Sequence, residues 1–187
     1  MKIKHRSCWF VMTLVFLFCA LPCSASTQQP KTVLDYFLLL PNSFFEIDRS
    51  VIGRKKWLYG IGRGVVDIKN DYLRMQGDGA QGTLNVALFR HKGKVLVAVQ
   101  NEAEEGSLSF LRYAGGVWKD TTTEVMPIPY NDRNTYIVPR YGTTIKVLRG
   151  NSFYDTKPDA KRARVYDFVW TGGRFKVKRY SQVSQRA

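Results

Sequence analysis

Residues 83–99 read TLNVALFRHKGKVLVAV, and this stretch decides the class of fold. Aliphatic residues occupy every second position of 84–88, which is the period of a β-strand that shows a different set of residues on each face. The turn-forming group His91-Lys92-Gly93 follows, and the β-rich run Val95–Val99 comes after it. The stretch therefore predicts an antiparallel hairpin.

Two further hairpins are expected downstream, and they resemble each other residue by residue. Residues 111–119 read LRYAGGVWK and residues 168–176 read FVWTGGRFK. In each copy an aromatic residue stands on either side of a Gly-Gly turn. We expect the two rings to pack across the strands, a contact that contributes about 0.2–1 kcal/mol. Two copies do not define a solenoid or propeller, which needs at least three stacked units, so the pattern predicts a meander of hairpins.

The strands of these hairpins are expected at 107–113 and 117–121 in the first copy, and at 164–170 and 174–180 in the second. Between 42 and 82 glycines interrupt every periodicity, and we expect mostly loop there. Two short strands, at 65–68 and 72–75, are the exception.

A short helix is predicted ahead of the hairpins, from Val33 to Leu40, where Pro41 stops it. Thr32 and Asp35 have the spacing of a capping box. Apolar residues lie on most sides of this helix, so it must be covered, and we favour the chain's own sheet over a partner protein as the cover.

The predicted fold is α+β and mainly antiparallel β, with one short N-terminal helix packed on a meander of β-hairpins. The sheet is expected to be partly closed, or to form a small barrel or sandwich. The expected core residues are Phe37, Leu38, Val86, Leu88, Val97, Phe110, Trp118, Phe168 and Phe175.

The first 26 residues have the pattern of a secretory signal peptide. Three basic residues precede an apolar stretch at 8–21, and small residues follow Pro22. A helix that spans a bilayer needs about 20 apolar residues, so we favour a cleaved signal over a membrane anchor or a lipoprotein signal at Cys23. We expect export to the periplasm or the cell exterior. All three cysteines lie in this segment, so the mature chain is expected to have no disulfide and no cysteine metal ligand.

The remaining chain is long enough for one domain with a proper core. We expect a flexible lead-in at 27–31 and a single β-rich domain at 32–187. The segment 1–26 holds three of the 29 basic residues and none of the 15 acidic residues, so residues 27–187 carry a net charge of +11. Such a charge favours encounters with polyanions in a salt-dependent way.

Two basic stretches with nearby aromatic residues, 49–74 and 155–180, supply most of this charge. Strand alternation places three cations of the second stretch on one face, opposite Phe175 and Val177. Such a ridge suits an anionic ligand, and it equally protects an edge strand from pairing with another chain. The candidate ligand-binding residues are Arg54, Lys55, Lys56, Trp57, Arg174, Lys176 and Lys178.

Catalytic candidates are few. His91 is the one histidine beyond the signal segment, and it lies at a predicted turn, where a solvated histidine is the favoured interpretation. Cysteine and histidine ligands for zinc are therefore missing. Glu102, Glu104 and Glu105 are interpreted as a solvated acidic turn, and the glycine-dense segment 76–82 as a tight connection. We expect no catalytic residue, no metal and no cofactor.

The leading functional hypothesis is a small exported, non-enzymatic binding protein whose basic surface meets an anionic cell-envelope polymer or a protein partner. Nucleic acid is a less favoured ligand for an exported chain with no recognisable nucleic-acid-binding motif. One alternative is a hydrolase that acts on envelope glycans through paired carboxylates. The other is an envelope assembly factor whose apolar helix at 32–40 docks on a partner.

Overall fold

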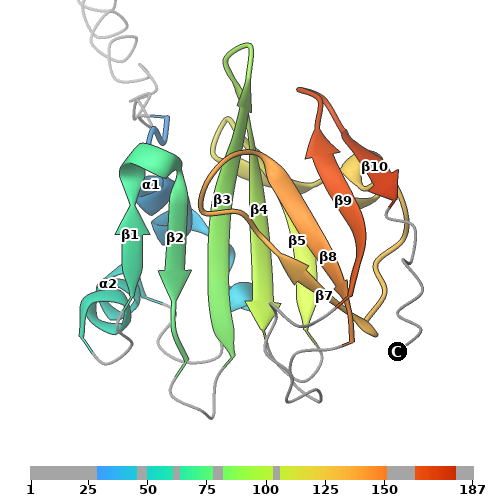
Figure 1. Ribbon diagram of the computed structural model, residues 1–187. Coiled ribbons are helices and arrows are strands. Elements are labelled where there is room, and N and C mark those ends of the chain that lie inside the picture. The colour runs from blue at the N-terminus through green and yellow to red at the C-terminus, as the bar shows by residue number, and fades with distance from the viewer. Residues whose placement is uncertain are drawn as a thin grey trace, which may run out of the picture.

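The computed structural model describes residues 29–45, 50–60, 64–77, 82–102, 106–150 and 163–179. The predicted signal segment 1–26 lies outside the described residues, as do most of the glycine-dense loop (78–81) and the acidic residues Glu104 and Glu105. The fold is α+β and mainly antiparallel β, as predicted, and its strands form two sheets that do not close into a barrel (Figure 1).

The first sheet is a meander of six strands in which each strand pairs with the next along the chain. Its members are β1 (Val65–Asp67), β2 (Tyr72–Met75), β3 (Thr83–His91), β4 (Lys94–Glu102), β5 (Ser107–Ala114) and β6 (Val117–Asp120). The predicted central hairpin is thus β3–β4, and the predicted pair at 65–68 and 72–75 is β1–β2.

The second sheet has four strands in the spatial order β10-β9-β8-β7. They are β7 (Asn134–Ile137), β8 (Thr144–Arg149), β9 (Arg164–Trp170) and β10 (Phe175–Arg179). The last predicted hairpin is confirmed as β9–β10. The strands β7 and β8 were not predicted, because polar residues break the apolar pattern of each.

The two similar hairpins lie in different sheets. Tyr113 is opposite Trp118 on β5–β6, with ring centroids 5.0 Å apart, and Trp170 is opposite Phe175 on β9–β10, with centroids 5.1 Å apart. The expected cross-strand packing is confirmed in both copies. Each hairpin forms an edge of its own sheet. The resemblance in sequence therefore reflects the Gly-Gly turn and the ring pair that the two hairpins share.

Helices cover one face of the first sheet. They are α1 (Val33–Leu39) and α2 (Val51–Tyr59), joined by a 3₁₀ turn at Asn42–Phe44; a second 3₁₀ turn lies at Ile68–Asn70, and α3 (Thr122–Val125) follows β6. The capping box of α1 is confirmed: the Thr32 hydroxyl accepts from the Asp35 amide at 3.2 Å, and the Asp35 carboxylate accepts from the Thr32 amide at 2.9 Å.

The interpretation of 42–82 as mostly loop was wrong for α2. Ser50 caps this helix by accepting from the Gly53 amide at 2.9 Å. Gly53 lowers the intrinsic helix propensity, but it lies on the buried side of α2 with Arg54 and Leu58. Packing of that side therefore outweighs the propensity on which the interpretation rested.

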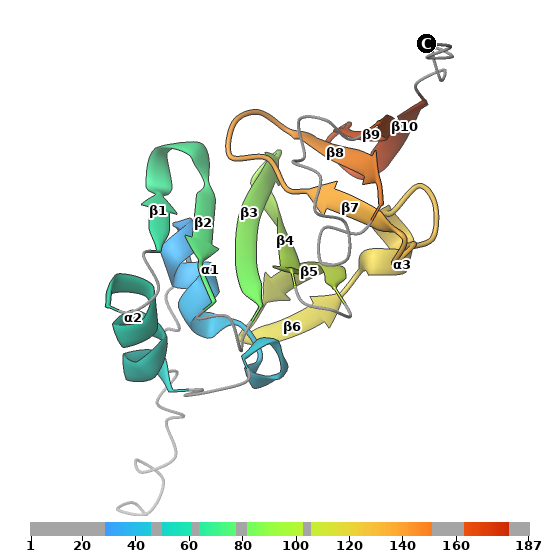
Figure 2. The same ribbon diagram turned by 60° about the horizontal axis from the view of Figure 1, so that its bottom comes forward.

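Two cores lie on opposite faces of the first sheet, and Figure 2 shows α1 on one side of this sheet and the second sheet on the other. Along β3, Leu84, Val86 and Leu88 pack toward α1, whereas Ala87 and Phe89 pack toward the second sheet. All nine predicted core residues are buried in, or packed against, one of these cores: the first holds Phe37, Leu38, Val86, Leu88, Val97 and Trp118, and the second Phe110, Phe168 and Phe175. The molecule thus has three layers: helices, six-stranded sheet, four-stranded sheet.

Candidate functional site

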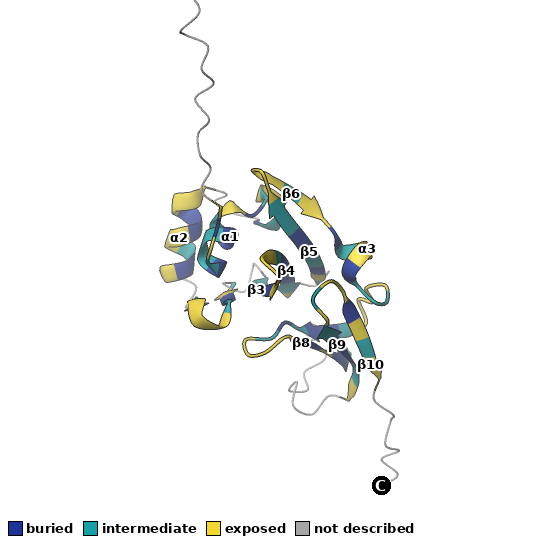
Figure 3. Cartoon of the chain, turned by 90° about the horizontal axis from the view of Figure 1, so that it is seen from above, coloured by how far each residue is buried: buried dark blue, intermediate teal, exposed yellow. Residues whose placement is uncertain are grey.

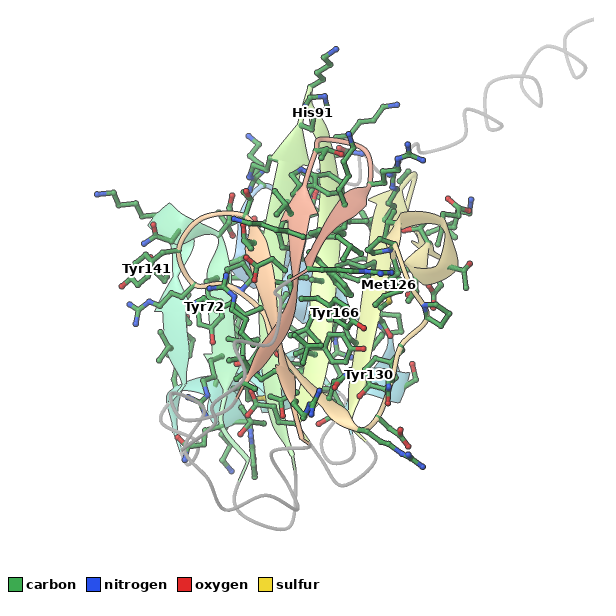
Figure 4. The ribbon with its side chains drawn as sticks, turned by 45° about the vertical axis from the view of Figure 1, so that its right-hand side comes forward. Tyr72, His91, Met126, Tyr130, Tyr141 and Tyr166 are labelled. Carbon is green, nitrogen blue, oxygen red and sulfur yellow. The ribbon has the colours of Figure 1, made fainter. Side chains whose placement is uncertain are left out.

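The β3–β4 hairpin and the β9–β10 hairpin end side by side, and a pocket lies between their tips. Figure 4 shows His91 at the end of the β3–β4 hairpin. Gly172, in the facing turn, has a φ of +91°, and a Cβ atom built on it would lie 2.5 Å from the His91 Nδ1. Only glycine fits this backbone conformation and this close approach, so the two turns are matched to each other.

The pocket has a volume of about 180 Å³. We call it the hairpin-tip pocket; it is lined by Phe89, His91, Lys92, Lys94, Val95, Leu96, Arg112, Trp170, Gly172 and Gly173. Three of these residues carry a permanent positive charge, and none of the lining residues is acidic. The pocket therefore presents a concentrated positive potential to solvent.

Strand alternation explains how the cations reach this place. Lys94 precedes Leu96 by two positions on β4, and Arg112 follows Phe110 by two positions on β5, so both project toward the second sheet. Lys92 lies in the turn itself, with a φ of +47°, a conformation for which Asn, Asp or Gly is preferred. Lys94 and Arg112 thus continue, toward the hairpin tips, the same rows of side chains that form the apolar core between the two sheets.

Arg112 is half-buried and has no partner among the described residues. Its Nε is covered from solvent and makes no hydrogen bond, and the same holds for the Nε1 of Trp170 across the pocket. Two other arginines, by contrast, are paired with carboxylates: Arg90 with Asp71 at 2.6 Å, and Arg140 with Asp67 at 2.8 Å. A covered donor without an acceptor is costly, so these two donors suit an acceptor that a ligand brings.

Phe89 and Trp170 line the floor of the hairpin-tip pocket, and further rings pack behind them. Trp170 lies 5.8 Å from Phe89 and 5.1 Å from Phe175, measured between ring centroids, and Phe175 lies 5.0 Å from Phe110. Phe89, Phe110 and Phe175 are almost completely buried. The cations therefore stand at the rim of a rigid apolar surface, an arrangement that can hold the apolar face of a ligand ring beside its charged group.

Of the predicted ligand-binding residues, Arg54 does not reach the surface. Its Nη1 donates to the carbonyl oxygens of Leu38 and Leu40, each at 2.8 Å, and its Nη2 donates to the Asn42 Oδ1 at 2.7 Å. The guanidinium also lies 3.9 Å from the ring centroid of Phe45. Burial lowers the pKa of Arg54, but the group stays charged at neutral pH. Arg54 joins α2 to the end of α1, and we remove it from the candidate set.

The neighbours of Arg54 on α2 have mixed positions. Lys55 and Lys56 are exposed, whereas Trp57 is half-buried against the first core and its Nε1 is covered and without a hydrogen-bond partner. Trp57 is therefore mainly a packing residue. Figures 1 and 3 place α2 on the opposite side of the molecule from β10, so the two predicted basic groups are not brought together.

The second predicted group, which we call the β10 ridge, consists of Arg174, Lys176 and Lys178. All three are exposed, and Phe175 and Val177 between them pack toward the second core, as the alternation predicted. β10 is an edge strand of its sheet, so edge protection also accounts for the ridge. Arg174 directly follows Gly173 of the hairpin-tip pocket, which links the ridge to the pocket.

Lys92, Lys94, Arg112 and Trp170 line the pocket but were not predicted as site residues from the sequence. His91 was interpreted as a solvated turn residue; the structure confirms the exposed position at the hairpin end but adds the contact with Gly172. The Gly-Gly turn of the second hairpin was visible in the sequence. Its partner turn was not, because the tips belong to two sheets whose packing no local pattern reveals.

The described carboxylates are used elsewhere. Asp35 caps α1, Asp67 and Asp71 pair with arginines, and Glu124 pairs with Lys119 at 2.7 Å. Asp167 accepts from the Arg164 Nε at 2.6 Å. No group of three His, Cys, Asp or Glu side chains within the described residues could hold a metal ion.

The described helices include none that is long and apolar enough to cross a membrane. Comparisons with protein-family models, with curated proteins and with solved structures found no match for this chain.

Proposed function

We propose that this chain is a small exported, non-enzymatic binding protein that holds an anionic group of an envelope polymer in the hairpin-tip pocket. The observation that carries the proposal is a half-buried arginine, Arg112, that has no acceptor and shares a pocket with Lys92 and Lys94 and no acidic residue. Export is supported by the pattern of the first 26 residues.

An Arg112 side chain without an acceptor costs the protein folding stability. A guanidinium that is partly removed from water without a counter-charge destabilises the fold, and residues that break such rules mark functional sites. An incoming carboxylate, sulfate or phosphate would supply the missing acceptor and would neutralise the charge repulsion among the pocket cations.

The rigid floor adds selectivity. Trp170, which is half-buried, offers apolar surface at low entropic cost because its ring is already packed against Phe89. A ligand with an apolar ring face beside an anionic substituent uses both parts of the pocket, whereas a simple inorganic anion uses only the rim. An acidic sugar unit of a polymer has this combination.

The test compares Arg112→Gln with Lys69→Gln, which changes the same charge at an exposed position outside the pocket. Binding of an anionic glycan is measured by calorimetry at several salt concentrations. Arg112→Gln is expected to weaken binding about tenfold or more, because hydrogen bonds to charged groups contribute about 1.5–3 kcal/mol, and Lys69→Gln is expected to leave it nearly unchanged.

Thermal unfolding of the same variants separates this role from a structural one. An arginine kept for binding leaves the fold as stable or more stable when it is replaced. A less stable Arg112→Gln variant with unaltered glycan affinity would show that the residue serves the fold, and the proposal would be rejected.

A further inference from the structure

A path of exposed cations leads out of the hairpin-tip pocket over the turn between β9 and β10. Gly172 and Gly173 form this turn, and a Cβ atom on Gly173 would meet nothing within 4 Å. No side chain therefore stands between the pocket and Arg174, the residue that follows. A chain-like ligand seated in the pocket can continue across bare backbone at this point.

Beyond the turn, Arg174 directly precedes β10 and Lys176 is the second residue of that strand, and both side chains are exposed. Val169 lies opposite Lys176 on β9, so among the described residues no carboxylate lies directly opposite this part of the ridge. Lys178 differs: Asp167 lies directly opposite it. The uncompensated part of the β10 ridge thus ends at Lys176.

From this continuity we infer that the ligand is a linear anionic glycan with one unit in the hairpin-tip pocket and the next units along Arg174 and Lys176. The inference rests on the proposed function, because it needs the pocket to bind the first unit. It assigns different roles to the two groups of cations. Arg112 and its neighbours anchor a single unit, and Arg174 and Lys176 favour longer chains over short ones.

A glycan fits this path better than a single-stranded nucleic acid. Proteins that follow single strands stack successive bases on successive aromatic side chains. Here the aromatic surface is confined to the pocket floor, around Trp170 and Phe89, and the path beyond it passes two glycines, Arg174 and Lys176. Anionic groups attached to a chain need only cations at intervals, which is what the ridge supplies.

The experiment uses oligogalacturonides of one, two, four and six units, with a neutral cello-oligosaccharide and oligothymidylate of matched charge as comparison ligands. The protein is expected to bind the tetramer about tenfold or more tightly than the monomer, since each added exposed ion pair raises affinity up to about fivefold. Affinity is expected to level off beyond the units that the pocket, Arg174 and Lys176 accommodate.

Two single variants on the same strand face form a matched pair. Lys176→Gln is expected to reduce the tetramer's advantage over the monomer and to leave monomer binding unchanged. Lys178→Gln removes the same charge one step further along, opposite Asp167, and is expected to change neither. Arg112→Gln is expected to weaken the binding of every length in proportion.

The outcomes distinguish the inference from the proposed function. If Arg112→Gln weakens monomer binding but length confers no advantage, or if the two lysine variants behave alike, the pocket stands and the path along β10 is overturned. Tighter binding of oligothymidylate than of the tetramer overturns the choice of glycan. If Arg112→Gln affects no ligand, the proposed function itself fails.

Discussion

At the scale of single residues, two neighbours on α2 show how differently adjacent cations can be used. Arg54 is 4% exposed and bonds to three oxygen acceptors around the end of α1, whereas Lys55 is exposed. Arg54→Met is expected to lower the free energy of unfolding by about 3 kcal/mol, because it leaves buried acceptors unpaired. Lys55→Met is expected to stay within about 0.5 kcal/mol of the native protein.

Chemical denaturation of both variants checks this prediction, and Arg54→Lys adds a control for charge. A single ammonium group cannot reproduce the planar fork that reaches Leu38, Leu40 and Asn42, so the lysine variant is expected to be destabilised too. Equal stability of Arg54→Met and Lys55→Met would contradict the joining role of Arg54.

Lys92 is a second residue where stability and binding are expected to diverge. Its left-handed conformation, with a φ of +47°, costs an ordinary side chain up to about 1 kcal/mol, and asparagine tolerates it better. Lys92→Asn is therefore expected to raise the unfolding temperature and to weaken anion binding at the same time. Unchanged binding in a stabilised variant would remove Lys92 from the site, and calorimetry of both properties decides the matter.

Tyr130 provides a pH-dependent prediction. Burial, then the nearby Tyr136 and Asp132, raise the pKa of Tyr130 to about 12. Below pH 10 the folded and unfolded chains both keep this proton; between pH 10 and 12 the unfolded chain releases it and the folded chain does not. The free energy of unfolding is therefore expected to fall with rising pH in this window.

The control compares Tyr130→Phe with Tyr141→Phe, whose ring is 68% exposed. Unfolding by urea at pH 9, 10 and 11 is expected to show a shallower decline for Tyr130→Phe and an unaltered decline for Tyr141→Phe. An identical decline in the native protein and Tyr130→Phe would contradict the raised pKa of this residue.

At the scale of the elements, the start of α1 was predictable because its signal is local. Thr32 and Asp35 are three residues apart, and their reciprocal hydrogen bonds need nothing from the rest of the fold. Thr32→Ala is expected to cost about 1 kcal/mol of stability, measured by denaturant unfolding. Thr32→Ser keeps the hydroxyl and is expected to stay close to the native value; a loss as large as that of alanine would show that the methyl group, and not the cap, matters.

The capping box of α1 also makes the stability of the protein depend on pH. Hydrogen bonds from the Thr32 and Lys31 amides lower the pKa of Asp35, so its contribution is present above the unfolded value and is lost as the pH falls through the folded value. Acid unfolding of Asp35→Asn is therefore expected to be less steep than that of the native chain.

Helix α2 and the hairpin-tip pocket are two features that local sequence patterns did not predict. The helix depends on Arg54 reaching oxygens 12 to 16 residues earlier, a contact that no periodicity encodes. The pocket depends on two turns, at Gly93 and Gly172, that meet only because two sheets pack face to face. The hairpins β3–β4, β5–β6 and β9–β10, the cap of α1 and the ring pairs were predicted since each is specified locally; the β7–β8 pair, the cap of α2 and the contacts between layers were not.

At the scale of the whole molecule, the first sheet contributes side chains to both hydrophobic cores, one on each of its faces. Strands β3 and β4 contribute Val86 and Val97 to the core against the helices, and Phe89 and Leu96 to the core against the second sheet. Neither core can lose its packing without exposing strands that the other requires. The apolar helix at 32–40 is also packed against the chain's own first core, since Val33 and Phe37 are fully buried.

This sharing predicts one cooperative unfolding transition. Phe37→Ala removes a ring from the first core and Phe168→Ala removes one from the second, and each is expected to cost about 3–5 kcal/mol and to lower the unfolding temperature by roughly 10 °C. Trp118 lies against the first core and Trp170 against the second, so variants that keep only one of these two among the chain's four tryptophans report each core separately. Both signals are expected to shift together in both alanine variants, because the six-stranded sheet transmits the loss. If Phe37→Ala moved the Trp118 signal alone and left the Trp170 transition in place, the two cores would be independent units, and the second sheet with its hairpin-tip pocket would fold without the helical layer.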